Sequence, residues 1–176
     1  MKGIQDPARG FPGIRYVLLH TFAHAVIRQL AVECGYTIAS IAERTYSQET
    51  GELRAGVLIY TAAPDSEGTL GGLCALGNPG KLGRHLDAAL ERARLCASDP
   101  LCAEHSPSVD SSLHGAACHA CTFLPETSCE RGNKYLDRSV LVKTVAKDSV
   151  AFFQATSDSE PGDENMSGGA TMVVES

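Results

Sequence analysis

A run of cysteines lies in a segment with few strongly apolar residues and limits how this chain can fold. The spacing is C-x5-C-x15-C-x2-C-x7-C, at Cys96, Cys102, Cys118, Cys121 and Cys129. Residues 96–132 are otherwise rich in proline, serine and histidine, so hydrophobic burial alone cannot offset the entropy that is lost when this segment becomes ordered. A C-x2-C turn points two thiolates at one ion, and a second pair completes a tetrahedron. The sequence therefore predicts that this segment folds around a metal ion.

The predicted metal is zinc in a structural role. Thiolate ligands select zinc or an iron–sulfur cluster over magnesium or calcium, and nothing else in the sequence indicates electron transfer. Cys102, Cys118 and Cys121 are predicted as three ligands, whereas Cys96 and Cys129 compete for the fourth position. Four thiolates leave no open coordination position, so the ion would stabilise the fold and would not activate water. The competing interpretation is a chance cluster of buried cysteines.

Cysteine usage also indicates the cellular compartment. Seven cysteines are an odd number, which fits a disulfide framework poorly, and Cys34 and Cys74 are expected to be small core residues. The N-terminal residues include no apolar signal sequence, and the longest apolar runs are too short to cross a bilayer. We therefore expect a reducing, cytoplasmic environment and no membrane insertion.

The net charge of −6 belongs to the C-terminal end of the chain. From Asp148 onward there are six acidic residues and no lysine or arginine, which leaves 15 acidic and 15 basic residues in the rest of the sequence. The composition of this end is typical of a disordered tail. We therefore expect a flexible leader (residues 1–13), one domain (14–153) and a disordered acidic tail (154–176).

Hydrophobic periodicity predicts an α+β domain, with a small sheet, about three helices and the cysteine-rich, zinc-stapled loop region. Amphipathic patterns predict three helices, at residues 14–34, 79–95 and 133–147. A further pattern predicts a short helix over residues 37–46, and the apolar run at 53–63 is typical of a central strand. The glycine-rich stretch at 65–73 lacks the lysine and the serine or threonine of a phosphate loop, so we interpret it as a tight turn.

Two histidines on the first helix need a separate interpretation. His20 and His24 are four residues apart and therefore share one helix face. An H-E-x-x-H arrangement would indicate a metalloprotease, but position 21 is threonine and no third ligand is identifiable, which favours hydrogen-bonded, partly buried histidines. The alternative is a small metal-dependent hydrolase or nuclease that uses His20, His24, Asp65 and Glu67.

A basic stretch follows the cysteines. Arg131, Lys134, Arg138 and Lys143 are accompanied by a single nearby acidic residue, Asp137. On a helix they would form a flank able to contact the DNA backbone, although a solvated helix face is an equally good interpretation.

Six sequence blocks, in this order, resemble a known family. They are HTFAHAVIRQL (20–30), ERTY (43–46), GVLIYTAAPDSEGTLGGL (56–73), CASDPLC (96–102), AACHACTFLPETSCE (116–130) and NKYLDR (133–138). Together they resemble the MrfA-like zinc-binding domain, which is found at the C-terminus of certain superfamily 2 DNA-repair helicases. It also occurs in DrmB, the helicase-associated protein of the DISARM antiphage system, and the PETSCE and LDR details are more similar to the DrmB type.

This resemblance implies an accessory module in which four cysteines hold zinc and which works with a DNA helicase. The first ligand pair of the family directly follows a helix, which favours Cys96 over Cys129 as the fourth ligand. The sequence has no G-x4-G-K-[ST] motif, so it is not the motor itself, and it is much shorter than DrmB. The expected function is a non-enzymatic accessory role in antiphage defence or DNA repair, through contacts with the helicase and the DNA backbone.

Overall fold

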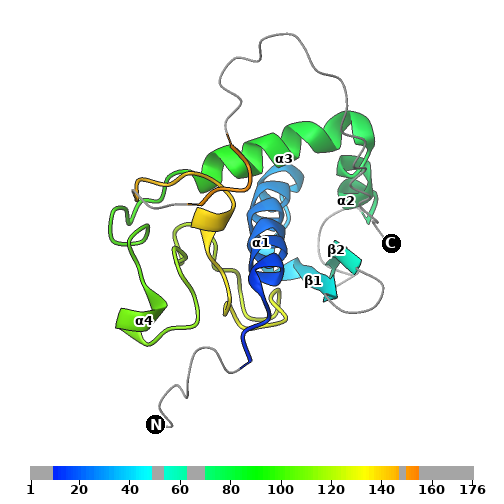
Figure 1. Cartoon of the computed structure of the whole chain (residues 1–176). Helices are drawn as coiled ribbons and strands as arrows, with labels where there is room; N and C mark the ends of the chain where they lie inside the picture. Colours follow the sequence, from blue (N-terminus) through cyan, green and yellow to red (C-terminus); the bar gives the residue numbers. More distant parts are fainter. Residues whose placement is uncertain (1–9, 49–53, 63–69, 147–149, 155–176) are drawn as a thin grey trace, which may run out of the picture.

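The computed structural model describes residues 10–48, 54–62, 70–146 and 150–154. The long helix α1 (Ile14–Cys34) runs through the middle of the molecule (Figure 1). A two-stranded sheet packs beside α1, helix α3 (Pro79–Ala93) crosses one end of it, and the cysteine-rich loops lie on the remaining side (Figure 1). This arrangement confirms the expected α+β class.

The sequence of α1 explains its central position. The consecutive residues Ala23, His24, Ala25, Val26 and Ile27 are all buried. Successive residues of a helix point in different directions, so a run of buried residues requires packing partners on several faces. The helix ends at Gly35, whose φ of 69° gives the left-handed C-cap that the sequence predicts.

The sheet includes a segment for which the sequence predicts a helix. After a short 3-10 turn, η1 (Ile38–Ser40), the chain enters strand β1 (Ile41–Gln48). Within β1, Glu43 and Thr45 are buried whereas Arg44 and Tyr46 are exposed, which is the two-residue period of a strand. The helix expected over residues 37–46 is therefore wrong, because pairing with a distant strand outweighs the local pattern.

Strand β2 (Arg54–Thr61) confirms the strand expected over residues 53–63. It pairs antiparallel with β1, with Ile41 opposite Thr61. Among the described residues β1 is its only partner, so β2 is not the central strand that its apolar run suggests. The run instead reflects one face that packs against the core, where Ile59 is buried.

Two helices connect the sheet to the cysteines. The first four residues of α2 (Leu70–Leu76) belong to the glycine-rich stretch expected to be a turn, and residues 65–69 lie outside the described part. Helix α3 begins at Pro79, as predicted, and the side chain of Asn78 caps it by accepting a 3.0 Å hydrogen bond from the backbone N–H of Gly80. His85, Ala89 and Ala93 form its buried face.

Residues 94–146 contain only short helical turns, α4 (Pro107–Asp110) and η2 (Arg138–Val140). The third helix, expected over residues 133–147, is therefore wrong. Asn133 and Tyr135 have positive φ angles of 60° and 59°, which interrupt a right-handed helix. Leu136, Leu141 and Val142 are buried individually and not on one helix face, whereas Val145, expected to face inward, is 51% exposed.

The hydrophobic core lies where α1, the sheet, α3 and the loop region meet. It includes side chains from all four parts, such as Ile27, Ile41, Ala89 and Leu141. In the described ranges, no helix combines the length and the apolarity that crossing a membrane requires.

Candidate metal centres

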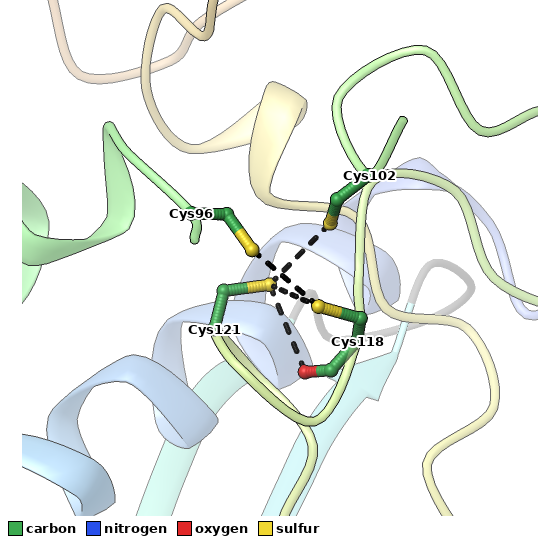
Figure 2. Close-up of side chains that lie close together, drawn as sticks. All are labelled: Cys96, Cys102, Cys118 and Cys121. Carbon is green, nitrogen blue, oxygen red and sulfur yellow. Dashed lines mark hydrogen bonds between the residues drawn. The ribbon is translucent and has the colours of Figure 1, made fainter. Parts of the chain in front are cut away.

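Four cysteine side chains converge between the end of α3 and the cysteine-rich loops (Figure 2). The sulfur atoms of Cys96, Cys102, Cys118 and Cys121 all lie within 4.8 Å of one another. The Sγ–Sγ distance is 3.4 Å for Cys96–Cys118, 3.6 Å for Cys102–Cys121 and 3.7 Å for Cys118–Cys121. Zinc–thiolate bonds of about 2.3 Å in a tetrahedron place the sulfurs about 3.8 Å apart. The donor set therefore fits zinc, which would be held by these four thiolates.

The backbone around each cysteine explains this convergence. Cys96 follows the end of α3, and its N–H donates a 2.9 Å hydrogen bond to the carboxylate of Asp99, which turns the chain toward Cys102. The Cys118-x2-Cys121 turn is closed by a 3.2 Å bond from the Cys121 N–H to the Cys118 carbonyl. The N–H of Ser98 also donates to the Cys96 sulfur at 3.3 Å, a contact that favours a thiolate.

The pKa values of the cysteine thiols in this group shift in opposite directions. Burial raises the pKa of the Cys118 thiol, but hydrogen bonds from Cys96 and from the Ala120 backbone outweigh this and lower it to about 7. Burial and the adjacent sulfur of Cys121 raise the pKa of Cys102 well above its usual range. Thiolates this close repel one another, so a divalent cation at the centre would be needed to hold all four in the ionised form.

Arg138, expected to contact DNA, belongs to the support of this site. Its side chain is completely buried, and its guanidinium donates hydrogen bonds to the carbonyls of Ala93 (3.1 Å) and Arg94 (3.0 Å). It also forms an ion pair with Asp99. Burial lowers the pKa of Arg138, but the Asp99 carboxylate and the nearby cysteines raise the pKa by more than burial lowers it. The guanidinium therefore stays charged. The expectation that Arg138 meets a phosphate is corrected, because no part of it reaches solvent.

The other three basic residues of that group are exposed: Arg131, Lys134 and Lys143. The Arg131 guanidinium lies 5.5 Å from the centroid of the Tyr16 ring. These residues lie on irregular loops and not on a helix face.

The fifth cysteine joins a second group of polar side chains, which the sequence does not reveal. Cys129 lies with His20, His24 and Glu43, and the four potential ligand atoms are all within 4.8 Å of one another. Nε2 of His20 is 3.3 Å from the Cys129 sulfur and 3.2 Å from Oε1 of Glu43. Of the two candidates for the fourth cysteine ligand, Cys96 lies with the other three cysteines, and Cys129 lies in the second group.

The second group is deeply buried and strongly coupled. His20 and His24 are 0% exposed, Glu43 is 2% exposed and Cys129 is 6% exposed. Burial lowers the pKa of His20, but hydrogen bonds with Cys129 and Glu43 outweigh it and raise the value to about 9. Burial raises the pKa of Cys129, yet the imidazoles of His20 and His24 lower it to about 6.

This burial bears on the hydrolase alternative. His20 and His24 point into the protein and cannot meet a substrate, whereas Asp65 and Glu67 lie outside the described residues. The i, i+4 spacing of the histidines was the only sequence signal for this group. Glu43 was missed because it lies on a strand for which a helix was expected.

The other cysteines and histidines whose side chains the structure describes belong to neither group. Cys74 is exposed, so the expectation that it packs in the core is wrong, and the side chain of Cys34 lies outside the described part. The rings of His105 and His114 stack at 4.6 Å, and His105 also lies 3.0 Å from Asp110. His119, within the C-x2-C turn, is exposed.

Comparisons with known proteins agree with the four-cysteine site. A family model described as the MrfA Zn-binding domain matches residues 22–122, a range that contains all four cysteines, and this match and the sulfur geometry together support structural zinc. DISARM protein DrmB from Bacillus paralicheniformis is 50% identical over 141 residues, which are 80% of this chain and 25% of that protein. The chain thus spans about a quarter of the length of the curated relative that it matches. It belongs to the MrfA Zn-binding domain family.

Proposed function

We propose that this chain is a non-enzymatic, zinc-stabilised accessory domain that works with a superfamily 2 DNA helicase in antiphage defence or DNA repair. The observation that carries the proposal is the convergence of four cysteine sulfurs within 4.8 Å of one another. Four thiolates fill every position around a tetrahedral ion, which is the arrangement of a structural and not a catalytic site. The 50% identity to a DISARM protein supports antiphage defence as the process.

The helicase motor is a separate partner or another part of a longer protein. The sequence contains no G-x4-G-K-[ST] motif, so this chain does not itself bind ATP through a P-loop. Cysteines that hold a metal as thiolates, instead of forming disulfides, are typical of a reducing compartment. We therefore propose that the protein is cytoplasmic.

An apolar groove supports a role in protein contact. Ile14, Val150 and Phe152 are large apolar residues with 62%, 82% and 68% of their surface exposed. They line one groove of about 960 Å³ beside the start of α1. Clustered exposed apolar side chains are typical of protein interfaces, so we assign this groove to the helicase.

Co-purification tests this function. The chain would be expressed with the superfamily 2 helicase encoded nearest to its gene, and we expect the two to elute as one complex from a gel-filtration column. Phe152→Asp should abolish the complex, because a carboxylate in the apolar groove would lose its hydration on binding. Val109→Asp is the matched control, since Val109 is 79% exposed on α4 and does not line the groove.

Three results would contradict the proposal. The first is a wild-type chain that stays separate from the helicase, and the second is equal binding of the helicase by the two variants. The third is divalent-metal-dependent cleavage of DNA by the purified chain that is lost in Asp65→Ala, because this would support the hydrolase or nuclease alternative.

Contact with the DNA backbone is part of the same proposal. Arg131, Lys134 and Lys143 are exposed and follow the cysteine-rich loops in sequence. Lysine and arginine on a surface bind phosphates without reading sequence, so this contact would help to hold DNA near the helicase.

A further inference from the structure

We propose that His20, His24, Glu43 and Cys129 form a second zinc site, distinct from the four-cysteine site. Their ligand atoms lie within 4.8 Å of one another, and all four residues are buried. Two imidazoles, one carboxylate and one thiolate are ligand types found at four-coordinate zinc. The four-cysteine group shares no residue with this set.

Two of the distances between ligand atoms are close to those around a tetrahedral ion, and the others are below 4.8 Å. His20 Nε2 lies 3.2 Å from Glu43 Oε1 and 3.3 Å from Cys129 Sγ. Zinc bonds of about 2.0–2.3 Å to nitrogen, oxygen and sulfur place neighbouring ligand atoms about 3.3–3.8 Å apart. An ion would therefore need only small shifts of these side chains.

Both histidines are oriented as metal ligands usually are. Nδ1 of His24 lies 2.9 Å from the carbonyl oxygen of Thr122, and Nδ1 of His20 lies 3.4 Å from that of Tyr135. A carbonyl only accepts a hydrogen bond, so Nδ1 donates to it and Nε2 is the nitrogen that would bind the ion, with zinc taking the place of any proton there. Nε2 of His24 is buried and has no hydrogen-bond partner among the described residues. A buried acceptor without a partner is costly, and coordination of zinc would satisfy it.

Hydrogen bonds also hold the two anionic residues, Cys129 and Glu43, in place. The Cys129 sulfur receives the backbone N–H groups of Asn133 at 3.2 Å and of Arg131 at 3.4 Å. Oε2 of Glu43 accepts from the Thr45 hydroxyl at 2.9 Å, while Oε1 lies 3.2 Å from His20 Nε2 and accepts from the Glu130 N–H at 3.3 Å. One thiolate and one carboxylate would balance the two positive charges of the ion, so the buried site would be about neutral.

This site would join parts of the chain that the first site does not join. His20 and His24 lie on α1, Glu43 lies on β1, and Cys129 comes from the cysteine-rich loops. The four-cysteine site connects only the end of α3 with those loops. The second ion would therefore fix the loops to the helix and sheet that form the core. Because it is closed and buried, its role would be structural.

The decisive experiment measures zinc in the wild-type protein. The full-length chain, purified without chelator, should contain two zinc ions per molecule by inductively coupled plasma mass spectrometry. X-ray absorption at the zinc edge should then show five sulfur and three nitrogen or oxygen ligands shared between the two ions. One zinc per chain with only sulfur ligands would overturn the proposal, as would a second metal other than zinc.

Variants then assign the second ion to these residues. His24→Gln and Glu43→Gln should each lower the content from two zinc ions to one, with the remaining ion bound only by sulfur. His85→Gln is the matched control, since His85 is also a buried histidine but belongs to neither group, and it should keep both ions. If a variant aggregates, the wild-type stoichiometry and ligand set still decide. Two ions retained in folded His24→Gln and Glu43→Gln proteins would contradict the assignment.

Discussion

The Arg138 guanidinium joins two segments that meet at the four-cysteine site. It binds backbone carbonyls at the end of α3 and pairs with Asp99, which in turn caps the Cys96 turn. Four thiolates around a divalent ion carry a net charge of about −2, which a buried cation nearby helps to offset. A planar group with several donors suits this position better than a lysine ammonium. The local sequence shows only a basic residue in a basic stretch, so its burial could not be predicted.

Loss of the Arg138 guanidinium should destabilise the protein strongly. Arg138→Ala removes one partner of a buried ion pair and leaves two carbonyls unsatisfied, which we expect to lower the free energy of unfolding by about 3–5 kcal/mol. Urea denaturation in the presence of zinc measures this change. The control is Lys134→Ala, an exposed residue for which a change within about 0.5 kcal/mol is expected. Equal stability of the two variants would show that the buried contacts of Arg138 contribute little.

Replacement of a ligand cysteine should remove zinc and structure together. Cys118→Ser leaves three thiolates, and zinc binding energy in such a site is folding energy. We expect an aggregated or largely unfolded protein by circular dichroism, without zinc at the four-cysteine site. Cys74→Ser changes an exposed cysteine outside both groups and should keep its fold and its metal. A full complement of zinc in Cys118→Ser would refute the ligand assignment.

The elements that could be predicted from the sequence are those defined by local signals. Helix α1 has both its apolar pattern and its glycine C-cap, and α3 has an asparagine cap followed by proline at its first position. Strand β1 was mistaken for a helix because its burial depends on pairing with β2 and packing on α1. The second group of polar side chains could not be predicted for a similar reason. Cys129 is 109 residues from His20, and only the tertiary fold brings them together.

The bend just before the C-x2-C pair requires glycine, because a side chain at Gly115 would have no room. A Cβ atom at Gly115 would overlap the carboxylate of Asp137, whose Oδ1 accepts hydrogen bonds from the N–H groups of Ala116 (3.2 Å) and Ser139 (2.9 Å). Gly115→Ala should therefore lower the free energy of unfolding by about 1–3 kcal/mol, because the displaced carboxylate loses these bonds.

Gly83→Ala provides the matched comparison for that prediction. Gly83 lies within α3, and a Cβ atom there meets nothing within 4 Å. Alanine is the better helix former, so this variant should gain about 0.5–1 kcal/mol. Urea denaturation of both proteins gives the comparison, and a Gly115→Ala protein as stable as Gly83→Ala would rule out the proposed overlap.

Across the whole molecule, two groups of polar side chains connect the cysteine-rich loops to the helices and the sheet. The loops from residue 94 to 146 contain few regular elements, yet they cover one side of α1 (Figure 1). The four-cysteine site fixes these loops to the end of α3, and the second group connects them to α1 and β1. The residues that line the apolar groove and the three exposed basic residues belong to neither group.

The basic residues give the last prediction. The combined substitution of Arg131, Lys134 and Lys143 by alanine should weaken binding to a fluorescent DNA duplex and lower the slope of log affinity against log salt by about 2–3, because each lost phosphate contact reduces it by about 0.9. Fluorescence anisotropy at several salt concentrations measures both quantities. The control replaces Arg44 and Lys81, which are exposed on β1 and α3, and should leave the slope unchanged. The loss should be similar for unrelated DNA sequences, since phosphate contacts carry no base information. Equal slopes for the wild type and the triple variant would mean that these residues do not touch DNA.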